Sequence, residues 1–346
     1  MTRLAITALL TVFALGASGC LDDTLQKRSI VAQWRVLAIV AEGPVARFGE
    51  DVRFEALVVD PEGERALHGV DGVEYRWSLC VRPERVPGLG GLQYDPESPS
   101  QGCGASELPE ELRARLEEIL FTSADGSFTV PALLTATLLE SLPAVVDASG
   151  FPPELIESIL ATTGIPLVVE LRVSRDGQET IVAFKRFLLT TAEGTLGTNP
   201  PPPRFRICTD RASCQTAPID GDTWLAGVEG ETFRCAPEDG ATPVVDAGAE
   251  VILDPEHGAP GGLDALPPWL EEYQVLDIRG ELLTVEERAY YSWFSTGGAF
   301  DQEITRSPVE QEIWRAPAEA GTYPLWLGVR DGHGGTSACR AEIEVR

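Results

Sequence analysis

The chain has 346 residues, of which 43% are hydrophobic, and this is enough apolar material for two cores. Its 54 acidic residues outnumber its 27 lysines and arginines and give a formal net charge of −27. This excess of negative charge repels phosphate groups, so we expect neither nucleic acid nor an anionic lipid face as a partner. A chain with this negative charge is expected to stay soluble outside the cell, or to bind divalent cations weakly.

The first residues have the pattern of an export signal. Arg3 is the one charge in residues 1–19, and the apolar stretch 4–15 behind it is too short to span a bilayer. The Ala-Ser-Gly-Cys sequence that ends at Cys20 resembles the lipobox of bacterial lipoproteins, although leucine is commoner than alanine at position 17. The resemblance implies that the signal is removed after residue 19 and that Cys20 receives acyl chains such as palmitate. The alternative is an ordinary signal peptide followed by a coincidental cysteine.

Residues 20–32 suit a short tether between the lipid and the folded body. In the sorting rule of some Gram-negative bacteria, Asp directly after the lipidated cysteine retains a lipoprotein at the inner membrane. This chain has Leu21 there, with Asp22 next, which favours the outer membrane. Acyl chains anchor firmly, because each buried methylene contributes about 0.8 kcal/mol. We therefore expect attachment to the outer membrane through the N-terminal lipid, on either its periplasmic or its surface face.

Strands are predicted by runs of valine, isoleucine and aromatic residues that are separated by Gly, Pro and Asp. In the first half of the chain these runs are 34–42, 51–60, 73–80, 166–174 and 179–189. The last two flank the turn RDGQ and predict a hairpin.

An insert at about residues 106–165 separates the third of these strands from the hairpin. Leucines at helical spacing and prolines near the starts predict helices over 108–121, 131–142 and 152–164. Long insertions between strands often bind a partner molecule. The alternative is that this insert covers an open sheet edge.

The second half repeats the scheme of the first. VEYRWSLC at 73–80 is matched by AYYSWFST at 289–296, and both carry Tyr-x-Trp. An Asp-Pro-Glu turn and a final hairpin with Arg-Asp-Gly also recur in the same order, which indicates a duplicated unit. The second half carries its own insert, around 266–278, before its Tyr-x-Trp strand. Residues 193–203 between the halves end in four prolines and predict an extended, stiff linker.

Short strands with frequent turns predict antiparallel sandwiches. The pattern of lipobox, Tyr-x-Trp strand and Arg-Asp-Gly hairpin resembles the immunoglobulin-like or PKD-like modules of bacterial surface lipoproteins. The resemblance implies a mainly β chain of two immunoglobulin-like sandwiches in tandem, over 33–192 and 204–346, the first with an α-helical insertion. It also implies that each sandwich is plugged by its own aromatic pair, namely Tyr75 with Trp77 and Tyr291 with Trp293. Members of this group are mostly not enzymes.

Six cysteines remain besides Cys20, and an even number in an oxidising compartment suggests three disulfides. We expect Cys80 to pair with Cys103 across a loop. In the sandwich fold the first and last strands are neighbours, which implies a bond between Cys235 and Cys339. Cys208 and Cys214 then close a short local loop. Exchange of partners among Cys208, Cys214 and Cys235, or free thiols, are the alternatives.

The sequence contains no recognisable catalytic or metal-binding motif. His68, His257 and His333 lie in turn-like segments without a second ligand at metal spacing, and we expect them to be solvated. Six acidic turn residues could gather around calcium, although Asp-Pro and Asp-Gly are also plain turn chemistry; these are Asp60, Glu62, Asp176, Asp254, Glu256 and Asp331. We therefore predict no catalytic residue, no metal site and no cofactor.

The leading hypothesis is a non-catalytic binding or structural module at the cell envelope, with an envelope protein or a glycan as the possible partner. The alternative is a calcium-assisted or carbohydrate-binding surface adhesin that uses exposed aromatics such as Trp224, Trp269 or Trp314. A third hypothesis, an enzyme with a scattered site, requires a deep pocket with converging polar groups. The oligomeric state stays open.

Overall fold

The structure is a computed structural model. It describes residues 29–62, 72–80, 121–123, 126–149, 153–193, 196–209, 214, 224–228, 231, 233–255, 267, 269–276, 282–302, 304–307 and 311–346. For residues 80, 121–123, 141–149, 153, 155 and 276 only the backbone is described. The signal, Cys20, Leu21, the predicted Cys80–Cys103 bond, His68, His257 and Glu256 lie outside this description.

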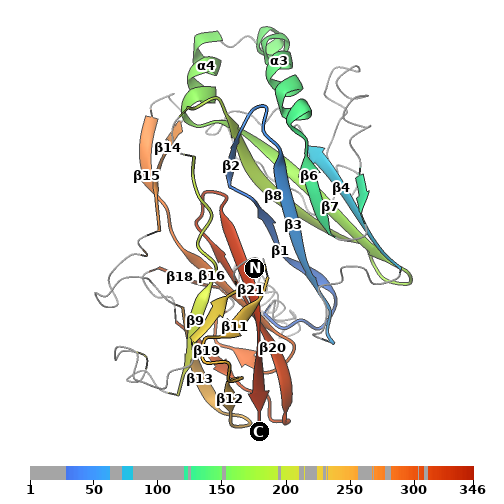
Figure 1. The fold of residues 1–346 in the computed structure, drawn as a ribbon, viewed down its shortest axis with the longest axis vertical. Helices are drawn as coiled ribbons and strands as arrows, with labels where there is room; N and C mark the ends of the chain where they lie inside the picture. The colour runs from blue at the N-terminus through green and yellow to red at the C-terminus, as the bar shows by residue number, and fades with distance from the viewer. Residues whose placement is uncertain are drawn as a thin grey trace, which may run out of the picture.

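In the described residues, the first half of the chain builds two β-sheets that face each other (Figure 1). One sheet has the order β1-β3-β6, with β1 at Arg35–Ala41, β3 at Val52–Val59 and β6 at Ser127–Val130. The other has the order β2-β8-β7-β4-β5, with β2 at Val45–Arg47, β8 at Ile181–Thr190, β7 at Ile165–Arg175, β4 at Val73–Cys80 and β5 at Phe121–Ser123. Neighbours are antiparallel except β2 and β8, which run parallel.

Strict alternation along β4 sends one set of side chains into the first core. Val73, Tyr75, Trp77 and Leu79 are buried while Glu74 and Arg76 are exposed. The Trp77 indole is fully buried and stacks on the ring of Phe128 from the opposite sheet, with centroids 5.5 Å apart. The tryptophan therefore joins the two sheets of the first half.

The predicted insert is only partly helical. Helix α3 spans Ala132–Ser149 and helix α4 spans Pro153–Thr162, whereas the region predicted as helix 108–121 is described only at Phe121, which begins β5. The insert also contains β6, whose alternating burial makes it an integral strand beside β3. The insert therefore contains two strands besides its helices, and the predicted helix over 108–121 lies outside the described residues except for its last position.

Helix α3 closes one end of the first core. Leu134 and Leu138 are buried in it, and the Asp51 carboxylate accepts a hydrogen bond of 2.6 Å from the backbone N–H of Ala132 at the start of the helix. The sequence predicted an end at residue 142, before Pro143, but the helix continues to Ser149. An internal proline removes one helical hydrogen bond, and this helix tolerates the loss.

The second half has two facing sheets and a separate hairpin (Figure 1). Within the described residues, the first sheet has the order β11 (Cys235–Pro237), β10 (Trp224–Gly227), β9 (Arg204–Cys208), β13 (Glu250–Pro255), β19 (Glu312–Arg315) and β17 (Ala299–Phe300). The second has the order β12 (Val244–Val245), β21 (Thr336–Val345), β20 (Gly321–Arg330), β16 (Tyr290–Ser295) and β18 (Ile304–Arg306). Strands β14 (Glu272–Leu276) and β15 (Leu282–Glu286) pair with each other and, in the part of the chain that the structure describes, with no other strand.

The second core repeats the arrangement of the first around Trp293. Its indole is fully buried and meets Phe205 of the opposite sheet edge to face, with centroids 5.3 Å apart. In the strand pairing, Trp77 lies opposite Leu171 and Trp293 lies opposite Leu327. Each leucine is on the first strand of the final hairpin of its half. The two halves are therefore built on one scheme, and the chain is mainly β, with two short helices in its described part.

Glu312 on β19 is a buried carboxylate in this second half. It is fully buried, and one of its oxygens accepts a hydrogen bond of 2.8 Å from the backbone N–H of Gln302. Burial raises the pKa of Glu312 from 4.5 to about 7, against the backbone hydrogen bonds that lower it. Because the folded protein holds this proton more tightly than the unfolded chain, the contribution of Glu312 to stability is full below pH 4.5 and is lost as the pH rises through about 7.

We therefore expect Glu312→Gln to flatten the pH dependence of unfolding. Between pH 4.5 and pH 8 the wild type should lose up to about 3 kcal/mol more free energy of unfolding than the variant. Urea unfolding at both pH values measures this difference. Glu319→Gln, at an exposed position of the same half, is the control and should leave the pH dependence unchanged. Equal pH dependence in wild type and Glu312→Gln would contradict the expectation.

No helix of the described residues is long and apolar enough to cross a membrane.

Candidate functional site

The two halves meet through a third apolar cluster that lies outside both sandwich cores. Trp326 and Ala338, from β20 and β21, pack with Leu57 and Val59 of β3. Val31, from the segment before β1, completes the cluster and is 1% exposed. An apolar contact of this kind restrains the relative motion of domains, because opening it would expose these side chains to water.

The N-terminal segment lies across this junction. Ile30 pairs in parallel with Ser295 of β16, where the backbone N–H of Val31 donates to the Ser295 carbonyl at 2.8 Å and the Ser295 N–H donates to the Ser29 carbonyl at 3.0 Å. Ser29 is 1% exposed. Residues from 29 onward therefore belong to the folded body, although the sequence placed them in the tether, and they attach to the second half before β1 enters the first.

The turn between β20 and β21 is the polar centre of the junction. One Asp331 oxygen accepts hydrogen bonds from the backbone N–H groups of His333 at 2.7 Å and Gly335 at 2.9 Å, which fixes the turn. Lys185, from β8 of the first half, donates to the Gly334 carbonyl at 2.6 Å and to the Thr336 hydroxyl at 2.7 Å. A side chain of one half is thus bonded into a turn of the other.

The linker is bonded to both halves. The Asn199 amide donates to the Ala41 carbonyl of the first half at 2.7 Å and accepts from the Thr336 N–H of the second at 3.0 Å. The Pro201 carbonyl accepts from the Ser337 hydroxyl at 2.9 Å. The sequence predicted an extended, stiff linker here, and the segment runs through the junction bonded to both halves.

Burial shifts the titration of the charged groups at this centre. It lowers the pKa of Lys185 to about 8, against the attraction of Asp331, so the ammonium is still charged at pH 7. Burial also raises the pKa of the Asp331 carboxyl, and the charge of Glu287 adds to the shift. The bonds of Lys185 and of one Asp331 oxygen suit holding the halves in place, while the other Asp331 oxygen is buried without a hydrogen-bond partner among the described residues.

His333 is not the solvated loop residue that the sequence predicted. Its ring stacks on Tyr273 of β14 with centroids 3.7 Å apart, and its Nδ1 lies 3.6 Å from a carboxylate oxygen of Glu287. Burial, followed by the charges of Glu287 and Asp331, raises the pKa of the Tyr273 hydroxyl. The stack attaches the β14–β15 hairpin to the junction turn, a contact that the sequence could not reveal because the residues are far apart in the chain.

Both described disulfides have the pairing that the sequence favoured. Cys235 is bonded to Cys339, with Cα atoms 5.3 Å apart, and the bond joins β11 of one sheet to β21 of the other. The reason given for this pair was wrong, because Cys235 lies on an edge strand of its sheet and β9 is the first strand of this half.

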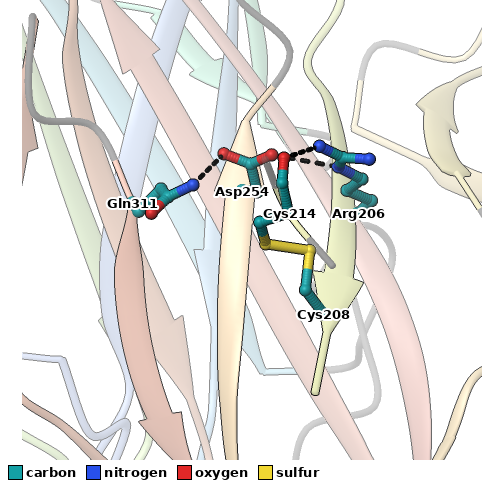
Figure 2. The surroundings of a disulfide bond; sticks show 5 residues. All are labelled: Arg206, Cys208, Cys214, Asp254 and Gln311. Carbon is teal, nitrogen blue, oxygen red and sulfur yellow. Dashed lines mark hydrogen bonds and ion pairs between the residues drawn. A yellow bond between two sulfur atoms is a disulfide. The ribbon is translucent and has the colours of Figure 1, made fainter. Parts of the chain in front are cut away.

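The Cys208–Cys214 bond lies beside a buried ion pair (Figure 2). Arg206 donates from Nε to Asp254 at 3.0 Å and from Nη2 to the Cys214 carbonyl, and the Gln311 amide donates to the other Asp254 oxygen at 3.0 Å. The two sulfurs and the carboxylate are close enough to suggest a metal site. However, sulfurs that are joined in a disulfide offer no thiolate, and the carboxylate is already paired, so the group is structural.

The aromatic residues proposed for carbohydrate binding are not exposed platforms. Trp314 is fully buried in the second core and Trp269 packs against that core. Trp224 is half-buried, with the guanidinium of Arg204 4.2 Å from its ring centroid and that of Arg206 at 5.2 Å. The prediction of exposed tryptophans was therefore wrong.

The carboxylates of Asp60, Asp254 and Asp331 bond to groups within the protein. Asp60 accepts a hydrogen bond from the backbone N–H of Glu62 at 3.0 Å, Asp254 pairs with Arg206, and Asp331 caps its own turn. The Asp60 and Asp331 contacts are the turn interactions expected of Asp before Pro or Gly, whereas the Asp254 contact is an ion pair with the neighbouring strand β9. In the described residues they do not assemble into a shared group of metal ligands.

A cavity of about 480 Å³, lined by both apolar and charged residues, opens near the start of β1. Its described lining combines the Trp34 ring with the Arg175 guanidinium and the carboxylates of Asp60, Glu62 and Glu179. This lining offers charged groups but brings no nucleophile and base together.

Comparison with known proteins adds little to this description. The chain matches no protein-family model and no curated protein. Similar solved structures include the D0–D1 domain of intimin, with 9% identity, coverage of 90% of this chain and 98% of that one, and a TM-score of 0.19. Another is E. coli alpha-2-macroglobulin, with 8% identity, coverage of 91% and 17%, and a TM-score of 0.21. A third is a 1.5-MDa bacterial ice-binding adhesin, with 7% identity, coverage of 91% and 65%, and a TM-score of 0.19. At these scores the likeness carries no argument about function.

Proposed function

We propose that the chain is a lipid-anchored protein of the bacterial outer membrane, and that its two-sandwich body serves as a non-catalytic binding or structural module. The anchor follows from the lipobox-like sequence that ends at Cys20. A single two-sandwich body is supported by the observation that two buried cores are joined at a junction of apolar contacts and hydrogen bonds.

The observation that carries this proposal is the course of the N-terminal segment. Residues 21–28 alone separate Cys20 from Ser29, which is buried at the junction. Fully extended, that stretch spans at most about 30 Å, so a lipid on Cys20 would hold the junction close to the bilayer. Because Ser29 and Val31 are bonded to Ser295 of the second half, the anchor would restrain both halves together. A short tether on a rigid body suits presentation of a fixed surface at the envelope.

Metabolic labelling with palmitate tests the anchor directly. In a Gram-negative host the wild type should incorporate the label and fractionate with the outer membrane, whereas Cys20→Ser should be unlabelled and leave the membrane fraction. The double variant Cys208→Ala with Cys214→Ala is the control, and it should keep the label because those cysteines form a disulfide in the body. Equal labelling and membrane association of Cys20→Ser would refute the proposal.

A further inference from the structure

The β14–β15 hairpin stands apart from the two sheets of the second half. Figure 1 shows it in orange, beyond the edge of those sheets. Its two strands pair only with each other among the described residues, so each has an outer edge whose backbone groups are free of sheet pairing there. A two-stranded ribbon gains little stability from its own pairing, and an unpaired strand edge is a natural place for a further strand to add.

The register of the hairpin divides its side chains between two different faces. Tyr273 lies opposite Val285 and Val275 opposite Leu283, so one face is apolar throughout. Leu283 is 47% exposed, and neither it nor the two valines belongs to any cluster of buried side chains in the described part of the chain. Beyond the Tyr273–His333 stack, this apolar face is not fully covered.

The other face carries the Leu276–Leu282 pair at one end and two opposed glutamates at the other. Glu272 and Glu286 lie directly opposite each other, both are exposed, and neither has an ion-pair partner among the described residues. Like charges in a directly opposed pair destabilise a ribbon. A cation placed between them would remove this repulsion.

The base of the hairpin is held firmly. The backbone N–H of Glu271 donates to the Glu287 carboxylate at 2.9 Å, and the Glu287 N–H donates to the Glu271 carbonyl at 3.0 Å. Together with the stack of Tyr273 on His333, these bonds fix the ribbon to the junction turn. A partner that docks here meets a pre-organised edge, which lowers the entropy lost on binding.

We propose that the hairpin is a docking edge for an extended segment of a cationic partner protein. The segment adds a strand, with its apolar side chains on the face of Val275, Leu283 and Val285 and its arginines or lysines on the face of Glu272 and Glu286. A second copy of this chain would bring like charges together, and an anionic lipid face would be repelled, so charge complementarity selects a basic partner. This inference rests on the proposed binding function and names the class of its partner.

Fluorescence anisotropy with a defined peptide tests the inference on the full-length chain in detergent. The probe is a labelled ten-residue peptide in which arginine and leucine alternate, and its companion alternates arginine with glycine. We expect the first to bind more tightly. Leu283→Ser should weaken its binding about tenfold, and Glu272→Gln with Glu286→Gln should weaken it about three- to tenfold.

Matched controls separate docking from general attraction to an acidic protein. Leu133→Ser changes a leucine on α3 that is 79% exposed, and Glu140→Gln with Glu157→Gln removes two exposed charges from the helices. Both should leave the Kd within about twofold. Equal weakening by the control variants, equal binding of the arginine–glycine peptide, or no binding of the arginine–leucine peptide would each overturn the proposal. Palmitate labelling does not involve the hairpin. The labelling experiment therefore tests the lipid anchor, and the anisotropy experiment tests the docking edge, independently of each other.

Discussion

Replacing Trp77 or Trp293 with alanine is expected to cost about 3–5 kcal/mol of free energy of unfolding. Both indoles are fully buried and contact an aromatic ring of the facing sheet, so each substitution removes a large apolar group and leaves a cavity between the sheets. Such a loss is a large part of the stability of a typical domain. Urea unfolding measures the loss, and hydrogen exchange locates it.

The exchange pattern should differ between the two tryptophan variants. Trp77→Ala should reduce protection first in β4, β7 and β8, and Trp293→Ala first in β16, β20 and β21, because each indole belongs to a separate buried cluster. Trp224→Ala is the matched control, since this tryptophan is half-buried on the outside of a sheet, and its cost should be well below that of the other two. A cost under about 1 kcal/mol for either core tryptophan would contradict the expected role.

Loss of the Cys235–Cys339 bond is expected to destabilise the second half more than loss of Cys208–Cys214. The first closes a loop with a sequence separation of 104 and joins two sheets, and the second has a separation of 6. In the chain-entropy account of disulfides a loop of about 100 residues contributes roughly 4.7 kcal/mol, and the contribution falls as the loop shortens.

Paired alanine substitutions at each bond isolate this effect. Cys235→Ala with Cys339→Ala should lower the free energy of unfolding by about 2 kcal/mol more than Cys208→Ala with Cys214→Ala. All four cysteines are buried, so the two double variants differ mainly in the size of the loop released. Thermal and urea unfolding under the same conditions give the comparison. The reverse order of stabilities would contradict the loop-entropy explanation.

Local pattern was sufficient to predict the Tyr-x-Trp strand and the final hairpin of each half. The alternation of buried and exposed residues in VEYRWSLC needs no distant information, and the recurrence of Tyr-x-Trp indicated the duplicated scheme. Prediction failed where a segment takes its structure from distant partners. Strand β6 forms because Phe128 fills the space above Trp77, and helix α3 runs past Pro143 where the local rule predicts an end.

The contacts at the junction could not be predicted from the sequence, because the residues that meet there are far apart in the chain. Lys185 and Thr336 are 151 positions apart, and nothing near either residue signals their hydrogen bond. The same holds for Ile30 with Ser295 and for Tyr273 with His333. The sequence analysis predicted Trp314 to be an exposed aromatic, but the pairing of its strand with β13 places it in the core.

The central claim is that two separately packed sandwiches are locked into one body at the Lys185–Thr336 junction. The most direct test is the distance between non-cysteine spin labels at Val182 in the first half and Ile304 in the second, which are 39% and 51% exposed. Double electron–electron resonance should give one narrow distance distribution. A broad distribution, as two domains moving freely on a flexible linker produce, would contradict the claim.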